Sequence, residues 1–260
     1  MKNGTIVKKT LFPSPNPHVE LYEVTYISSG LRVKGLLAEP ALKGEYDGFL
    51  YLRGGIKGVG MVRPARIAQF ASHGFIVFAP FYRGNLGGEG NEDFAGDDRE
   101  DAISGIELLK NHSAAAPDRI HVFGFSRGGV MALMAGIESR DVTSVVTWGG
   151  VSDMFLTYDE RKDLRRMMKR VIGGSPNKVP ERYEWRTPLY SLEYLDAPVL
   201  IIHGEKDRNV SVDHAYRLEK RLRELGKPVS SYYFKEYTHY FPPRKNQQIV
   251  SMLCSWMKDQ

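Results

Sequence analysis

The sequence predicts an α/β fold whose central sheet is mostly parallel. Short, nearly continuous apolar runs recur along the chain, a pattern typical of strands that are covered on both faces. Segments with apolar residues at helical spacing lie between these runs, and alternation of strand with helix favours a parallel sheet. The five runs are Phe49-Leu50-Tyr51-Leu52, Phe75-Ile76-Val77-Phe78-Ala79, Ile120-His121-Val122-Phe123, Val145-Val146-Thr147-Trp148 and Val199-Leu200-Ile201-Ile202.

The front of the chain predicts a different kind of strand pair. Polar and apolar residues alternate over 20–27, and residues 31–38 have similar strand character. The turn sequence Ser28-Ser29-Gly30 separates the two segments. We therefore expect an antiparallel hairpin that extends one edge of the sheet.

Helices are predicted between the core strands and after them. Pro64 can open a helix over about 64–73, because proline is favoured in the first helical turn. Apolar residues recur at helical spacing over 97–109, over 213–225 and in the last stretch of the chain. The acidic segment 89–101 holds seven acids and one base. We expect it to favour the start of helix 97–109, since acids stabilise a helix N-terminus.

Composition restricts the function classes. The 260 residues are 42% hydrophobic and 26% charged, and no apolar run reaches the length of a membrane-spanning helix. The first residues lack the apolar core of a secretory signal, and the single cysteine, Cys254, excludes an internal disulfide. No nucleotide-binding or zinc-binding motif is present. We expect one domain over 1–260 in the cytoplasm, with no membrane partner and no cofactor or metal.

Basic residues are unevenly distributed. The net charge is +5, and segment 161–186 holds nine bases and three acids. A basic segment can bind nucleic acid, but no nucleic-acid-binding motif accompanies this one. We expect a solvated helix face, or an ion-pairing partner for the acidic segment 89–101, and no nucleic-acid partner.

The strongest local signal is Gly124-Phe125-Ser126-Arg127-Gly128. It follows an apolar strand and precedes a helical run, the context of a sharp strand-to-helix turn that presents a nucleophilic serine. The flanking glycines leave room for close backbone packing, and the helix N-terminus favours negative charge at the site. The alternative is a glycine-rich turn that only packs the helix against the strand.

A serine hydroxyl needs a base, and the base needs an orienting acid. In folds with this turn, the chain order is serine, acid, histidine. His239 follows the last predicted strand and is chosen as the base, with His214 second, because loops at that end of a sheet collect active-site groups. Asp207 is chosen over Glu205 as the acid, since it can reach back over the sheet edge. Its alternative role is to cap the turn that follows it.

The oxyanion that develops during acyl transfer needs backbone donors. One donor is the amide of Arg127, directly after the serine. The other is expected from Arg53-Gly54-Gly55-Ile56, which follows an earlier strand, with Gly55 as the preferred donor. The alternative is an ordinary strand-ending turn.

Several motifs in this order resemble the catalytic domain of the prolyl oligopeptidase family of α/β-hydrolases. The resemblance covers the chain from about residue 20 to its end. It implies the α/β-hydrolase fold, a catalytic triad of Ser126, Asp207 and His239, and an oxyanion hole formed by the Gly55 and Arg127 amides. The motifs are Arg53-Gly54-Gly55, Tyr82-Arg83-Gly84, Gly124-Phe125-Ser126-Arg127-Gly128-Gly129, His203-Gly204-Glu205-Lys206-Asp207-Arg208-Asn209-Val210 and Tyr237-Thr238-His239.

The sequence departs from the family pattern in two ways. Family members often end the oxyanion strand with His-Gly-Gly-Pro, where this chain has Arg53-Gly54-Gly55-Ile56, so any role of that histidine is lost. Large members carry a β-propeller ahead of the hydrolase domain, and about 45 residues before the first core strand are too few for one. Without that peptide filter, small esters become the expected substrates.

Residues 151–195 lie between two core strands and are expected to form a cap or lid. Their apolar side chains could line an acyl-group site or only pack the cap onto the core. Phe155 in this segment and Tyr82 are the candidate substrate-binding residues. We expect a serine hydrolase that cleaves small carboxylic esters, or short peptide and aminoacyl amides, through an acyl-serine intermediate. The alternatives are a peptidase of the prolyl oligopeptidase type and a non-catalytic ligand-binding protein on the same scaffold.

Overall fold

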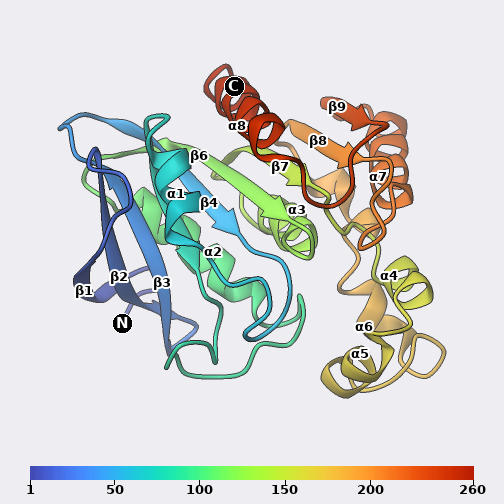
Figure 1. Cartoon of the computed structure of the whole chain (residues 1–260). Coiled ribbons are helices and arrows are strands. Elements are labelled where there is room, and N and C mark those ends of the chain that lie inside the picture. Colours follow the sequence, from blue (N-terminus) through green and yellow to red (C-terminus); the bar gives the residue numbers. More distant parts are fainter.

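Nine strands form one sheet in the computed structural model, which describes residues 1–260 (Figure 1). The strand order across the sheet is β1-β2-β3-β5-β4-β6-β7-β8-β9. The strands are β1 (Ile6–Phe12), β2 (Val19–Ser28), β3 (Leu31–Pro40), β4 (Tyr46–Leu52), β5 (Phe75–Pro80), β6 (Ala115–Phe125), β7 (Val142–Trp148), β8 (Val199–Gly204) and β9 (Val229–Phe234).

The predicted mixture of parallel and antiparallel pairing is confirmed. Strands β4 to β9 are all parallel to their neighbours within that group, whereas β2 and β3 form the antiparallel hairpin, and β3 joins the sheet antiparallel to β5. Strand β1 was not predicted, because five consecutive exposed residues leave it without an apolar pattern. It pairs antiparallel with β2 and forms one edge of the sheet.

Helices cover both faces of the sheet (Figure 1). The alternation of side chains along a strand explains this arrangement. Phe49 and Tyr51 of β4 pack in a core with α1 and α8, while Leu50 and Leu52 pack in a second core with α2, α3 and α7. The helices are α1 (Pro64–Ala71), α2 (Arg99–Lys110), α3 (Gly128–Glu138), α7 (Asp213–Glu224) and α8 (Pro243–Lys258).

The segment between β7 and β8 contains three short helices and two 3-10 turns. Figure 1 shows α4, α5 and α6 beside the carboxyl-terminal ends of the parallel strands. These elements are α4 (Met154–Glu160), α5 (Arg165–Ile172), α6 (Pro180–Glu184), η1 (Pro188–Tyr190) and η2 (Leu192–Tyr194). None of the helices in the chain combines the length and the apolar composition that crossing a bilayer requires.

The chain changes direction across the sheet at β4. Strand β5 lies on one side of β4, and β6 lies on the other. Such a switch leaves a crevice beyond the carboxyl ends of the strands, where open α/β sheets bind their ligands. The loops that follow β4, β6, β7 and β8 therefore gather at one edge.

Candidate active site

Ser126 occupies the sharp turn between β6 and α3. Its φ is 58°, in the left-handed region that side chains other than glycine rarely adopt. Hydrogen bonds on both sides hold this conformation. The Ser126 amide donates to the Trp148 carbonyl (3.2 Å), and the Ser126 carbonyl accepts from the amides of Gly129 and Val151 (2.9 Å each). The strained serine predicted from the motif is therefore present in the structure.

Glycines allow the backbone to close around this turn. A Cβ at Gly124 would lie 2.0 Å from the Gly128 carbonyl oxygen, and one at Gly128 would lie 2.1 Å from the Leu52 carbonyl oxygen. A Cβ at Gly54 would lie 2.6 Å from the Ser126 Cβ. A side chain at Gly124 or Gly128 would collide with a backbone oxygen, and one at Gly54 would displace Ser126, so β4, β6 and α3 pack closely beside Ser126.

Asp207 and His239 meet beyond the end of β8. Asp207 Oδ2 accepts a 2.6 Å hydrogen bond from His239 Nδ1. Asp207 Oδ1 accepts from the amides of Asn209 (2.8 Å) and Val210 (3.0 Å), so the carboxylate also caps the turn, as its alternative role required. Because Nδ1 donates to the carboxylate, Nε2 of the neutral ring keeps its lone pair and can accept a proton.

Gly149 lies where Ser126 and the Asp207–His239 pair approach each other. It follows Trp148, whose carbonyl accepts from Ser126. A Cβ at Gly149 would lie 3.2 Å from His239 Nδ1 and 3.3 Å from Asp207 Oδ2. The Phe125 ring, next to Ser126 in the chain, lies 4.8 Å from the His239 ring. No hydrogen bond joins Ser126 Oγ to His239 Nε2. Hydrogen bonds between a candidate nucleophile and its base are often long or poorly aligned before substrate binds.

The competing histidine has other partners. His214 is fully buried on α7. Its Nδ1 accepts from the amides of Ser152 and Asp153, and its Nε2 donates to Glu160. With both ring nitrogens occupied, His214 has no free atom to serve as a base.

Two backbone amides beside Ser126 lack protein acceptors. The Arg127 amide at the start of α3 and the Gly55 amide in the loop after β4 donate to no protein group. Gly55 has a φ of 67°, and a Cβ there would lie 2.3 Å from the Val59 carbonyl oxygen, so only glycine fits. Free amides of this kind can stabilise an oxyanion, particularly at a helix N-terminus.

The two predicted substrate-binding residues have different surroundings. Phe155 on α4 is half-buried, and its ring lies near those of Tyr183 (5.6 Å) and Tyr190 (6.4 Å). Tyr82 is fully buried, with its ring 5.0 Å from the Arg53 guanidinium and 4.8 Å from that of Arg127. Tyr82 thus has no surface to offer a substrate, and the predicted contact does not fit its position. Its aromatic ring packs between two cations instead.

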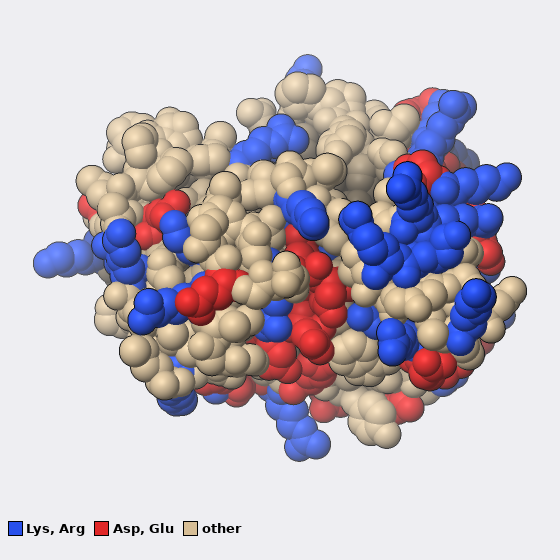
Figure 2. Space-filling view, turned by 90° about the horizontal axis from the view of Figure 1, so that it is seen from below, with Lys and Arg blue, Asp and Glu red and all other residues tan.

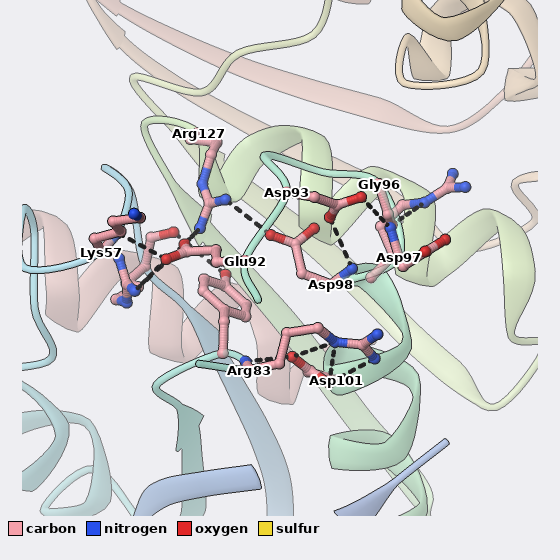
Figure 3. Close-up of polar contacts among 12 residues, drawn as sticks. Lys57, Arg83, Glu92, Asp93, Gly96, Asp97, Asp98, Asp101 and Arg127 are labelled. Atoms are coloured by element: carbon pink, nitrogen blue, oxygen red, sulfur yellow. Dashed lines mark hydrogen bonds and ion pairs between the residues drawn. The ribbon is translucent and has the colours of Figure 1, made fainter. Parts of the chain in front are cut away.

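The acidic segment 89–101 supplies the residues that sequence reasoning missed. Figure 3 shows Glu92 between Lys57 and Arg127, and Asp98 on the other side of Arg127. The expected acids at the start of α2 are present, with Glu100 and Asp101 in its first turn and Asp93 accepting from the amides of Asp97 and Asp98. Asp98 itself is the N-cap but makes no capping hydrogen bond. Its carboxylate pairs with Arg127 (3.1 Å). We call Arg53, Tyr82, Glu92, Asp98 and Arg127 the buried charge cluster.

Burial changes the protonation of one member of this cluster. Asp98 is completely inaccessible, and this burial raises the pKa of its carboxyl group from 3.8 to about 7. The negative charges of Asp93 and Glu92 act in the same direction, and the Arg127 guanidinium opposes them. A substantial fraction of Asp98 is therefore protonated near neutral pH.

Comparison with known proteins decides the family. Residues 61–260 match the model of the prolyl oligopeptidase family. The chain belongs to this family. It is 65% identical to an uncharacterized peptidase, YtmA, of Bacillus subtilis (strain 168), over 98% of this chain and 100% of that protein. As a member of this family, the chain is a serine hydrolase. The family and this relative favour the peptidase alternative over the hydrolysis of small esters that was expected from the sequence.

Two solved structures bear out the α/β-hydrolase fold expected for the family. A puromycin-hydrolyzing peptidase of Mycobacterium tuberculosis superposes with a TM-score of 0.83 at 22% identity. The match covers 94% of this chain and 40% of that one. An acetyl xylan esterase from Paenibacillus sp. R4 superposes with a TM-score of 0.74 at 17% identity, covering 95% and 87%. At these identities the likeness concerns the fold alone.

Charge is unevenly distributed over one face of this family member. Figure 2 shows acidic side chains gathered near the centre and many basic side chains on the right, the side on which Figure 1 has α4, α5, α6 and α7. Arg186 pairs with Asp93 (3.3 Å), so the basic and acidic segments do contact each other. Four basic residues of this segment are exposed and form no ion pair: Lys162, Arg166, Lys169 and Arg170.

No group of three or more histidine, cysteine or acidic side chains could hold a metal ion.

Replacing Gly54 with alanine should impair the site without unfolding the chain. The new Cβ would lie 2.6 Å from Ser126 Cβ and 3.2 Å from its Oγ, so the serine must shift. A shift of about 1 Å in the position of a reacting group lowers kcat/KM by about 10²-fold. Gly58→Ala in the same loop is the matched control, because nothing lies within 4 Å of its Cβ. Equal hydrolysis rates for the two variants would contradict this close packing.

Asp98 should make stability depend on pH. Its pKa is about 7 in the folded chain and 3.8 ordinarily, so between these values the folded state holds a proton that the unfolded state releases. The free energy of unfolding should therefore fall as pH rises through this window. Asp98→Asn cannot ionise and should lose this part of the slope. Thermal melts of both proteins between pH 5 and 8 test the point, and parallel profiles would refute it.

Proposed function

We propose that the chain is a serine peptidase that cleaves amide bonds of short peptides or aminoacyl amides, with esters as further substrates. Ser126 is the nucleophile, His239 the general base and Asp207 the orienting acid. The observation that carries the proposal is the Asp207–His239 hydrogen bond of 2.6 Å beside the strained turn that presents Ser126. Membership of a peptidase family supports amides ahead of the esters favoured from sequence.

The reaction would proceed in two halves. His239 Nε2 takes the Ser126 proton as Oγ attacks the substrate carbonyl carbon, and the carbonyl oxygen becomes an oxyanion. The amides of Gly55 and Arg127 donate to that oxygen. His239 then returns the proton to the leaving amine or alcohol, and an acyl-serine remains. Water attacks the ester carbon with His239 again as base, which releases the acid and restores Ser126.

Asp207 has a supporting role in this scheme. Its Oδ2 fixes the proton on His239 Nδ1, so that Nε2 faces the serine as an acceptor. When the ring becomes an imidazolium, the carboxylate stabilises the positive charge. The two amide hydrogen bonds to Oδ1 hold the acid in place throughout the cycle.

Segment 151–195 is proposed as the cap that borders the acyl group. It begins at the site, because the Val151 amide donates to the Ser126 carbonyl (2.9 Å). Phe155 is half-buried on its first helix and carries the proposed apolar contact to the substrate. An aromatic side chain at the rim of a site can take an apolar acyl or side-chain group.

Ser126→Ala tests the proposal directly. With aminoacyl and dipeptidyl p-nitroanilides and short-chain p-nitrophenyl esters as substrates, we expect kcat/KM to fall by at least about 10⁴-fold. The melting temperature should be retained, because the Ser126 hydroxyl makes no hydrogen bond in the structure. Near-wild-type turnover by this variant would rule out the nucleophile. If the wild-type protein cleaves only the esters, it is an esterase. If it cleaves neither the anilides nor the esters, a ligand-binding protein is favoured.

A further inference from the structure

A buried arginine, Arg53, donates hydrogen bonds to the loop that carries the Gly55 amide. Arg53 is 1% exposed. Its Nη1 donates to the carbonyls of Gly54 (3.0 Å) and Val59 (3.2 Å), at the two ends of the turn that contains Gly55. Its Nη2 donates to the Phe81 carbonyl (2.9 Å). The guanidinium therefore sets the shape of this turn and ties it to the end of β5.

A single carboxylate joins this loop to the turn that carries Ser126. Glu92 accepts from Arg53 Nη2 (3.2 Å) and from the Lys57 amide (2.7 Å). It also accepts from Arg127 Nη2 and from Asn85 Nδ2 (3.0 Å). Arg127 supplies the second candidate oxyanion donor through its own backbone amide. Glu92 is thus in contact with both sides of the proposed oxyanion hole.

The remaining contacts prevent either guanidinium from moving alone. Arg127 Nη1 donates to Asp98 (3.1 Å), and the Tyr82 ring packs against the guanidiniums of both Arg53 and Arg127. Arg127 is 2% exposed and Glu92 is 7% exposed. Figure 3 shows Glu92 between the two sides, with Asp98 beyond Arg127. Low exposure keeps these charge-assisted hydrogen bonds strong and free of competing water.

Stability alone is a weak reason for such an arrangement. Buried ion pairs often stabilise a fold no better than apolar side chains of similar volume. Oxyanion stabilisation, in contrast, depends on donors that are fixed before the reaction begins. We infer that Glu92 is a positioning residue that fixes the Gly55 and Arg127 amides relative to each other. This inference rests on the proposed function, and it accounts for how the chain works with Arg53 where family members often have histidine.

The inference predicts a loss that is confined to the transition state. In Glu92→Gln the side chain keeps its shape, but the two guanidiniums lose their shared negative charge. The amides should drift apart, so kcat should fall by about 10²-fold while KM changes little. A trifluoromethyl ketone inhibitor tests the same point. Ser126 Oγ adds to its carbonyl carbon, the carbonyl oxygen becomes an oxyanion, and the Ser126 proton moves to His239. The inhibition constant of the ketone should therefore rise by the same factor in Glu92→Gln.

Asp101→Asn is the matched control. Asp101 is a fully buried carboxylate of the same segment, paired with Arg83 (2.9 Å), and it touches neither oxyanion side. It should lower the melting temperature as Glu92→Gln does, yet leave kcat and ketone inhibition near wild type. Melting temperature, kcat, KM and ketone inhibition are measured on wild type and both variants. A purely structural Glu92 would give the same kinetics as Asp101→Asn, and that result would overturn the inference.

A second variant decides the matter if Glu92→Gln does not fold cooperatively. Arg53→Lys keeps the positive charge but cannot reach Gly54, Val59 and Glu92 together. Arg53→Lys should lower kcat and raise the inhibition constant of the ketone to a similar extent. Full activity of this variant would overturn the inference. The proposed function fails separately, if wild type neither turns over substrate nor is inhibited by the ketone. Inhibition that persists in Ser126→Ala would have the same meaning.

Discussion

Close backbone packing around Ser126 is the constraint on which the rest of the site depends. The left-handed turn persists because β4, β6 and α3 meet at glycines, where any Cβ would collide with a carbonyl oxygen or with the serine itself. The same packing leaves the amides of Gly55 and Arg127 without protein acceptors. The strained backbone at Ser126 and the free amides beside it therefore have one origin, the close approach of three backbone segments.

The parallel sheet and the acidic segment 89–101 each help to bring the residues of the proposed site together. The sheet brings the ends of β6, β7, β8 and β9 to one edge, so Ser126 and His239, more than a hundred positions apart in the chain, reach a common region. The buried charge cluster is a second link between the loop after β4 and the turn after β6, in addition to the backbone packing at Gly54, and Glu92 contacts both segments.

Much of this could be predicted from the sequence, because the signals were local. Buried strands appear as apolar runs, and Gly-x-Ser-x-Gly between a strand and a helix is typical of a turn that presents a nucleophile. Chain order then selected His239 and Asp207. The charge cluster could not be predicted in this way. Glu92 is one of seven acids of similar appearance, and only the fold reveals that it turns inward towards arginines 39 and 35 residues away in sequence. Tyr82 was misassigned for the same reason.

The structure of the chain after reaction with a fluorophosphonate tests the central claim most directly. Serine Oγ displaces fluoride at phosphorus, and the phosphonyl oxygen mimics the oxyanion. The account predicts phosphorus bonded to Ser126 Oγ, with the phosphonyl oxygen about 2.7–3.1 Å from the amide nitrogens of Gly55 and Arg127. His239 Nε2 should lie within hydrogen-bond distance of Ser126 Oγ. Phosphorus on another side chain, or a phosphonyl oxygen directed away from both amides, would contradict it.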